Sequence, residues 1–171
     1  MIPILFKIVR TGIVSEPEPP PRDDWRVDGA PIQEDILRML GRALVIREVD
    51  AGSCNGCELE IHAMSGPRYN LEGLGIRFAA SPRHADLLLV TGPVSRNMQE
   101  PLRIAYEAMP NPKVVVAVGD CGCNGGIFGE SYATVGGVAK VIPVDVAVPG
   151  CPPDPVAILQ GILTAVTARA R

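Results

Sequence analysis

The sequence predicts an α/β protein of the flavodoxin-like, doubly wound type, in which a mostly parallel sheet carries helices on both faces. Short, fully apolar runs alternate along the chain with amphipathic helical patterns. Strands that are apolar on both faces are typical of parallel sheets buried between helices. The 18 glycines and 17 prolines occur without a period, which indicates tight connecting loops and excludes collagen-like and solenoid folds.

The first half of the chain contains one helix before the first strand and one after it. Pro31 is expected to open the first helix, and its inward face carries Ile36, Leu37, Leu40 and Leu44. The pattern then predicts, in order, a strand, a helix and two strands, at 45–49, 57–64, 76–79 and 86–90. A Gly-Pro pair at 66–67 ends the second helix.

The second half continues the alternation with two more helices and two more strands. A helix is predicted at 96–109, where Pro110 ends it, followed by strands at 114–118 and within 141–148. Pro155 is expected to open a last helix through residue 168. The inward positions of these two helices are Met98, Leu102, Ala105, Met109, Val156, Leu159, Ile162, Leu163 and Val166.

The chain of 171 residues, 47% hydrophobic and 20% charged, is long enough for one domain with a substantial core. Residues 1–30 are expected to be an N-terminal extension, because an apolar stretch leads into a Pro-rich acidic linker at 15–24. We interpret this extension either as a flexible tail or as an arm that docks on a partner or a membrane surface. Residues 31–171 are expected to form the folded domain.

Composition excludes several classes of function. The net charge is −3 and aromatic residues make up 4%, so the sequence offers neither a basic surface nor base-stacking residues for nucleic acid. No apolar run reaches the roughly 18 residues of a membrane span, and no signal peptide is visible. Five cysteines, an odd number, indicate reduced thiols in the cytoplasm. No catalytic set of side chains and no nucleotide-binding loop is apparent.

The cysteines all follow predicted strands. Because ligands of doubly wound sheets bind outside the carboxyl ends of the strands, thiols that are distant in sequence are expected to meet at one edge. The thiols and the strands they follow are Cys54 and Cys57 after 45–49, Cys121 and Cys123 after 114–118, and Cys151 after 141–148.

Each group of cysteines lies in a Gly-rich turn, at 52–57, 119–126 and 150–153. Glycine lets the backbone approach a ligand closely, and N–H donors to sulfur help to set the potential of an iron–sulfur cluster. Thiolates without a nearby histidine favour iron–sulfur or zinc. A [4Fe–4S] cluster would take Cys54, Cys57, Cys151 and one of Cys121 or Cys123.

Three other interpretations of the cysteines stay open at this point. A structural zinc site usually uses two C-x-x-C pairs, and only Cys54 and Cys57 form one. Dithiol redox chemistry at that pair would leave three cysteines without a role. The last alternative is that all five are inert packed thiols. Spacing favours the iron–sulfur interpretation.

Four motifs occur in a recognisable order, at 50–60, 81–94, 119–128 and 142–153. Over about residues 40–167 the sequence resembles the small, electron-transfer subunit of energy-converting membrane-bound [NiFe] hydrogenases, including those of formate hydrogenlyase and CO-dependent systems. It is also similar to the respiratory complex I subunit that holds the last cluster before quinone. In the complex I branch the first two cysteines are adjacent, whereas Cys54 and Cys57 are separated as in the hydrogenase branch.

The resemblance implies one [4Fe–4S] cluster whose ligands are Cys54, Cys57, Cys121 and Cys151, with Cys123 as a packed thiol. It implies electron relay to a NiFe site in a large subunit, from a ferredoxin-like polyferredoxin subunit, in a complex with membrane ion-pumping subunits. The chain itself would be non-catalytic and peripheral on the cytoplasmic side of the membrane. The alternatives are a complex I-like quinone oxidoreductase subunit, a sulfur-reducing relative and a zinc-stabilised interaction module.

Further residues are candidates for supporting roles near the cluster. The carboxylate of Glu58 would lower the cluster potential or, when protonated, relay protons. Arg83 and His84 lie in a predicted loop, from which a cation would raise the potential. Each also has a simpler explanation: Glu58 as a solvated or partner-facing carboxylate, and Arg83 and His84 as members of a salt bridge or a helix-end contact. Asp120 and Asn124 are expected to shape the turn, and the apolar Ile127, Phe128 and Pro152 to be buried against the large subunit.

Overall fold

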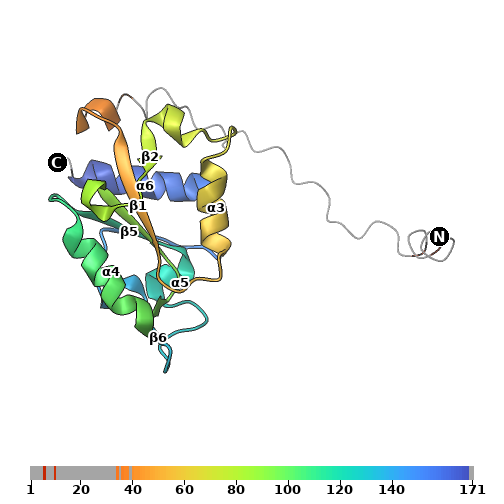
Figure 1. Cartoon of the computed structure of the whole chain (residues 1–171). Coiled ribbons are helices and arrows are strands. Elements are labelled where there is room, and N and C mark those ends of the chain that lie inside the picture. The colour runs from red at the N-terminus through yellow and green to blue at the C-terminus, as the bar shows by residue number, and fades with distance from the viewer. Residues whose placement is uncertain (1–5, 7–9, 11–33, 35, 39, 170–171) are drawn as a thin grey trace.

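A parallel five-stranded sheet forms the centre of the computed structural model, which describes residues 6, 10, 34, 36–38 and 40–169 (Figure 1). Its strands are β1 (Leu44–Asp50), β2 (Ile76–Phe78), β3 (Leu87–Thr91), β5 (Val114–Val118) and β7 (Val146–Val148). They lie in the order β2-β1-β3-β5-β7, and every neighbouring pair is parallel. When only the strands of this sheet are numbered along the chain, the order becomes 2-1-3-4-5, which is the flavodoxin-like order. The predicted fold class is therefore confirmed.

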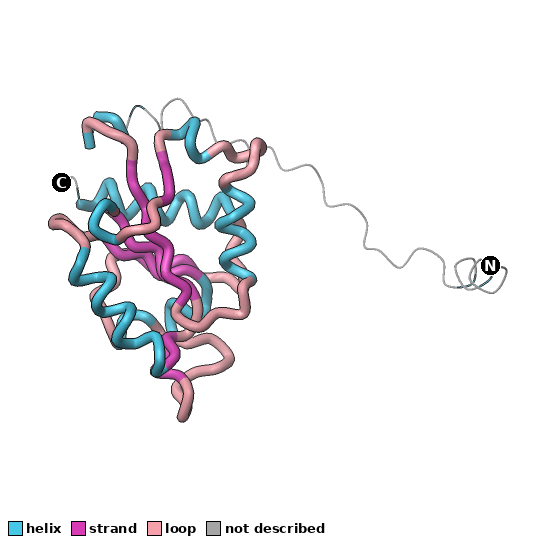
Figure 2. The backbone as a smooth tube through the Cα atoms, viewed as in Figure 1, coloured by secondary structure: helices cyan, strands magenta, loops and turns pink. Residues whose placement is uncertain are grey.

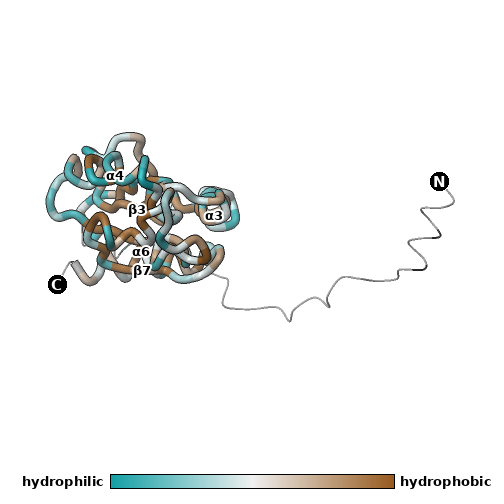
Figure 3. Tube along the Cα trace, turned by 90° about the horizontal axis from the view of Figure 1, so that it is seen from below, coloured by the Kyte–Doolittle hydropathy of each residue, from teal (hydrophilic) through white to brown (hydrophobic). Residues whose placement is uncertain are grey.

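Helices cover both faces of this sheet, as Figure 2 shows. On one face, α3 (Gly56–Met64) and α6 (Pro155–Arg169) pack on a core that includes Ile46, Leu87 and Val116. On the other, α4 (Arg96–Ala108) packs on the alternate side chains of the same strands, such as Leu88 and Val115. In Figure 3 β3 is coloured hydrophobic, whereas parts of α3 and α4 at the periphery are hydrophilic. The alternation follows from the two-residue period of strands.

Several short elements were not predicted from the sequence. A second, antiparallel sheet joins β4 (Val94–Ser95) to β6 (Thr134–Gly136), and such short strands carry no readable alternation. The Gly-rich segment after β5, expected to be a turn, begins with the helix α5 (Gly119–Asn124). The remaining short helices are the 3₁₀ helices η2 (Leu71–Leu74), η3 (Pro82–His84) and η4 (Val138–Lys140).

The predicted first helix is only partly described. Residues 34, 36–38 and 40 are helical and Ile36 is fully buried, but Leu37 is 46% exposed and so does not face inward. Leu44 does not extend this helix; it is the first residue of β1, because Gly41 at φ 64° takes the left-handed conformation that commonly ends a helix. Pro31 and, apart from residues 6 and 10, the expected extension at 1–30 lie outside the described residues.

The packing of α6 differs in detail from its predicted inward face. Leu159, Ile162 and Val166 are buried as expected, and Ile158 is fully buried as well, while Val156 is only half-buried. In the described part of the chain, none of the helices has both the length and the apolar character needed to cross a membrane.

Candidate functional site

The carboxyl ends of three strands bring four of the five cysteines together. Cys57, in the first turn of α3, interacts electrostatically with the thiols of Cys54, Cys121 and Cys151, and Cys121 interacts with Cys54 and Cys151. None of the cysteines forms a disulfide, and Cys54 and Cys151 are exposed. We call these four residues the cysteine rim. The predicted meeting of sequence-distant thiols at one sheet edge therefore occurs for this set.

Two glycines leave the space that the sulfur atoms of the cysteine rim occupy. Gly119 opens α5 at φ 82°, and a Cβ added there would lie 2.6 Å from Sγ of Cys57. Gly126 has φ 53°, and a Cβ there would lie 2.8 Å from Sγ of Cys121. Real Cβ atoms do not approach sulfur so closely, so only glycine allows these backbone segments to lie against the thiols.

Cys123 lies apart from the cysteine rim. Its thiol is 3.9 Å from the carbonyl oxygen of Ala117 in β5, and it is half-buried. Burial raises the pKa of the Cys123 thiol, with a further increase from Asp120 and a decrease from a hydrogen bond with the backbone of Val148. None of the other thiols contributes to that pKa. The side chain therefore packs toward the sheet.

Aspartate side chains fix the loops that carry the rim. Asp120 and Gly150 exchange two hydrogen bonds, from the Asp120 amide to the Gly150 carbonyl and from the Gly150 amide to Oδ1 of Asp120, both 2.8 Å. Oδ1 of Asp50 accepts from the amides of Gly52 and Ser53, each at 2.7 Å. Asp120 was expected to shape its own turn, whereas it links two cysteine-bearing loops. The role of Asp50 gave no signal in the sequence beyond its position at the end of a strand.

Negative charge is disfavoured among the thiols. Burial raises the pKa of Cys57 to about 12, and Glu58 and the other three rim thiols add to the increase. Burial also raises the pKa of Cys121, as do Cys151, Cys54 and Asp120. A rim of four thiolates therefore requires positive charge from a bound group. Within the described residues, no three His, Cys, Asp or Glu side chains are placed to hold a single metal ion.

Glu58 lies beside the rim with both carboxylate oxygens buried and no hydrogen-bond partner among the described residues. It also acts on Glu48 of β1, whose pKa is raised mainly by burial. Arg47 and Glu48 line a surface cavity of about 280 Å³ together with Phe78, Ala79 and Ala80. This cavity includes none of the cysteines.

The structure does not place Arg83 and His84 at the rim. Both belong to η3, which precedes β3, and β3 begins opposite Ile46 and Val114 at the amino ends of its neighbours. The cysteines follow the carboxyl ends of the strands, so these two cations lie at the opposite edge of the sheet. The expectation that they point at a cluster is corrected on this ground.

Comparison with known proteins identifies relatives over most of the chain. Residues 54–165 match the family described as NADH ubiquinone oxidoreductase, 20 Kd subunit. The probable membrane-bound hydrogenase subunit mbhJ of Pyrococcus furiosus is 46% identical over 136 residues, which cover 80% of this chain and 81% of that protein. Formate hydrogenlyase subunit 7 of Escherichia coli is 45% identical over 80% of this chain, and the match spans about half of that longer protein, 53%.

The structure of the membrane-bound sulfane sulfur reductase, an archaeal respiratory membrane complex, contains a chain with the same fold. That chain is 34% identical to this one with a TM-score of 0.65, and the match covers 82% of this chain and 75% of that chain. The relatives are thus subunits of oxidoreductase complexes, as the four sequence motifs predicted. By the match over 54–165 and the high identity over four fifths of its length, the chain belongs to the NADH ubiquinone oxidoreductase 20 Kd subunit family.

Proposed function

We propose that this chain is the electron-transfer subunit of an energy-converting, membrane-bound [NiFe] hydrogenase complex, and that the cysteine rim holds one proximal [4Fe–4S] cluster. The observation that carries the proposal is the gathering of Cys54, Cys57, Cys121 and Cys151 at one edge of the sheet, from three separate stretches of chain. When bound, such a cluster accepts and donates single electrons, and its protein surroundings set its potential.

The residues of the cysteine rim fit a [4Fe–4S] cluster chemically. The donors are four thiols without an imidazole among them, which is the ligand set of iron–sulfur clusters. Burial raises the pKa of the Cys57 thiol, and a thiol that coordinates a metal releases its proton to solvent. Gly119 and Gly126 keep the space beside two of the sulfurs free of side chains.

The rest of the chain positions and protects the thiols. Asp50 fixes the loop before Cys54, and Asp120 ties the start of α5 to the loop that carries Cys151. The strands β3 and β5, whose residues are all buried, end at the sheet edge that carries the rim. The exposed thiols of Cys54 and Cys151 lie on the outer side, where a partner subunit would exclude water and oxygen.

The relatives support a place in a membrane-bound assembly. The Pyrococcus furiosus relative is a probable membrane-bound hydrogenase subunit. The proposed partners follow from the sequence resemblance: a NiFe-bearing large subunit that the chain would contact, and a ferredoxin-like polyferredoxin subunit from which it would receive electrons. Its attachment to the cytoplasmic side of the membrane would be peripheral, through ion-pumping membrane subunits. Cys54 and Cys57, separated by two residues, favour the hydrogenase branch over the complex I branch.

Two alternatives rest on specific matches: reduction of sulfane sulfur, from the 34% identical structure, and reduction of quinone, from the family description. The test is anaerobic purification of the complex through a tag on this chain, followed by assays with a reduced viologen donor. The hydrogenase proposal predicts hydrogen evolution. Reduction of sulfane sulfur or quinone without hydrogen evolution would replace it with the matching alternative. The zinc alternative predicts a colourless protein, because zinc has no charge-transfer band in the visible range.

A further inference from the structure

The segment 125–133, between α5 and β6, presents three large apolar side chains to solvent. Ile127 is 92% exposed, Phe128 52% and Tyr132 95%. We call this segment the docking loop. Apolar groups gathered in one exposed place on a soluble surface mark interaction sites, whereas single exposed residues do not.

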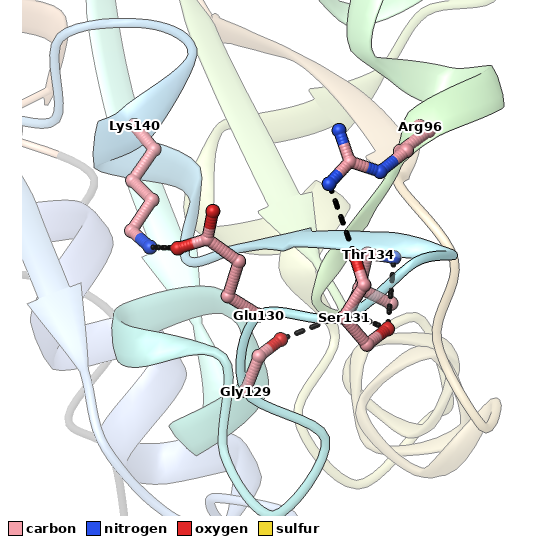
Figure 4. Close-up of polar contacts among 6 residues, drawn as sticks. All are labelled: Arg96, Gly129, Glu130, Ser131, Thr134 and Lys140. Carbon is pink, nitrogen blue, oxygen red and sulfur yellow. Dashed lines mark hydrogen bonds and ion pairs between the residues drawn. The ribbon is translucent and has the colours of Figure 1, made fainter.

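Hydrogen bonds from outside the docking loop hold its backbone in place (Figure 4). Arg96, the first residue of α4, donates from Nε to the carbonyl of Tyr132 and from Nη2 to the carbonyl of Ser131, both at 3.0 Å. Its own amide donates to the carbonyl of Ala133 at 2.9 Å. The C-terminal end of the loop, at residues 131–133, is thus anchored to the first residue of α4.

Contacts with Thr134 of β6 and Lys140 of η4, which follow the docking loop in sequence, complete this support. The hydroxyl of Thr134 donates to the carbonyl of Gly129 at 2.9 Å and lies 2.8 Å from the hydroxyl of Ser131. The carboxylate of Glu130 pairs with Lys140 at 2.6 Å. Glu130 is therefore paired with Lys140, and the large hydrophobic side chains of the loop that stay exposed are Ile127, Phe128 and Tyr132. A loop already fixed in one shape loses little conformational entropy when it binds.

The docking loop is continuous with the cysteine rim. It begins directly after α5, which carries Cys121, and Gly126 lies against Sγ of that residue. Cys54 and Cys151 of the rim are themselves exposed. A protein that covers the rim closely enough to exchange electrons therefore meets the loop as well.

We propose that the docking loop is a preformed anchor for the subunit that covers the rim, and that Arg96 is the positioning residue that maintains its shape. This rests on the proposed function, which makes that subunit the NiFe-bearing large subunit. Its matching surface would be an apolar pocket with a hydrogen-bond acceptor for the Tyr132 hydroxyl. Rigid tyrosine and aliphatic side chains inserted in a pocket are typical of the residues that dominate interface affinity.

The test places the photo-crosslinking residue p-benzoylphenylalanine at position 132 of the full chain in its native complex, and at position 104 as a control. Ile104 is 56% exposed and lies on α4, eight residues along the helix from Arg96. The proposal expects crosslinks from position 132 to peptides of the large subunit, identified by mass spectrometry, and none to that subunit from position 104. Crosslinks from 132 to a second copy of this chain or to another subunit, or no crosslink in an intact complex, would overturn it.

A second measurement tests Arg96 itself. Arg96→Ala is expected to reduce the amount of large subunit recovered with the tagged chain by about tenfold. The effect would be indirect, because the Arg96 side chain bonds the loop backbone rather than belonging to the loop itself. Arg103→Ala, on the same helix, is the matched control and is expected to leave recovery unchanged. Arg96→Lys is expected to restore part of the recovery, because its ammonium still donates to one carbonyl. Equal recovery for all three variants would refute the positioning role.

Iron measured in the same samples separates this inference from the function on which it rests. A complex that loses iron when the chain carries Cys121→Ser, but gives no crosslink from position 132, contradicts the docking loop alone. A complex that gives the crosslink but loses no iron with Cys121→Ser contradicts the electron-transfer function alone.

Discussion

Asp120 and Gly150 are joined by two hydrogen bonds that run in opposite directions, each 2.8 Å long. Each of these residues directly precedes a rim cysteine, Cys121 and Cys151. The pair therefore fixes the distance between two thiols that are 30 residues apart in sequence. Gly150 has φ 137°, and a Cβ there would lie 2.6 Å from Cα of Pro153, so no other residue allows this approach.

Removal of the Asp120 carboxylate is expected to loosen the rim. Asp120→Ala leaves the part-buried amide of Gly150 without its acceptor, so the free energy of unfolding should fall by about 1–3 kcal/mol. Asp120→Asn keeps an acceptor oxygen and should recover much of the loss. Thermal unfolding and iron content of the anaerobic protein measure both effects. Equal iron content in the alanine variant and the wild type would show that this link does not position the thiols.

A methyl group at Gly119 is expected to disrupt the rim directly. Gly119→Ala adds a Cβ that would lie 2.6 Å from Sγ of Cys57, in a left-handed conformation that itself costs about 1–2 kcal/mol. Gly41→Ala is the control, because Gly41 also has positive φ but open space around its Cβ. Both variants should be destabilised, and only Gly119→Ala should lose bound iron. Loss of iron in both, or in neither, would contradict the role of Gly119.

Glu58 is expected to influence the cluster potential through its charge. Its carboxylate oxygens are buried without a hydrogen-bond donor among the described residues, so little screens their field at Cys57. Glu58→Gln should raise the midpoint potential by tens of millivolts, on the order expected for one nearby charge in a partly buried site. Glu60→Gln, on the same helix, is the control. A redox titration followed by EPR measures the shift, and equal potentials in all three proteins would exclude Glu58 as a determinant.

Stability is expected to depend on pH through Glu48. Burial, then Glu58 and Asp50, raise the pKa of this carboxyl above 4.5, against the opposing effects of Arg47 and His62. The folded state therefore holds this proton more tightly than the unfolded state. The resulting stabilisation is complete below pH 4.5 and is lost as the pH rises through the raised pKa of the folded state.

Urea unfolding of the wild type and of Glu48→Gln across that window tests this dependence. The glutamine variant should lack the part of the decline in unfolding free energy that comes from Glu48. Curves of the same slope in both proteins would show that Glu48 titrates alike in the folded and unfolded chains.

The sequence predicts the central sheet chiefly because β3 and β5 are short apolar runs. The position of the cysteines follows from that sheet, since parallel strands end at the same edge. Arg83 and His84 were proposed from their place in a predicted loop, without this rule; because they come before a strand, the rule puts them at the opposite edge. The helix α5 was missed because a segment with glycine at 119 and 122 has little helical propensity; in the structure this helix packs on β5 and β7, among other elements.

Hydrogen bonds between distant loops are the part that the sequence does not indicate. The link between Asp120 and Gly150 and the support of the docking loop by Arg96 depend on pairs 30 or more residues apart. No local pattern marks such pairs, since each partner is an ordinary turn or helix residue. The exposure of Ile127 and Phe128 was expected to serve a partner, while the scaffold that fixes them became evident only in three dimensions.

The most direct test of the central claim uses two cysteines that are two positions apart. Iron and acid-labile sulfide are measured in the anaerobically purified complex that carries the wild-type chain, Cys121→Ser or Cys123→Ser. We expect equal iron and sulfide in the wild type and in Cys123→Ser, and about one to four fewer iron atoms per complex in Cys121→Ser, through conversion or loss of the cluster. Zinc in place of iron, or a cluster that survives Cys121→Ser and is lost in Cys123→Ser, would contradict it.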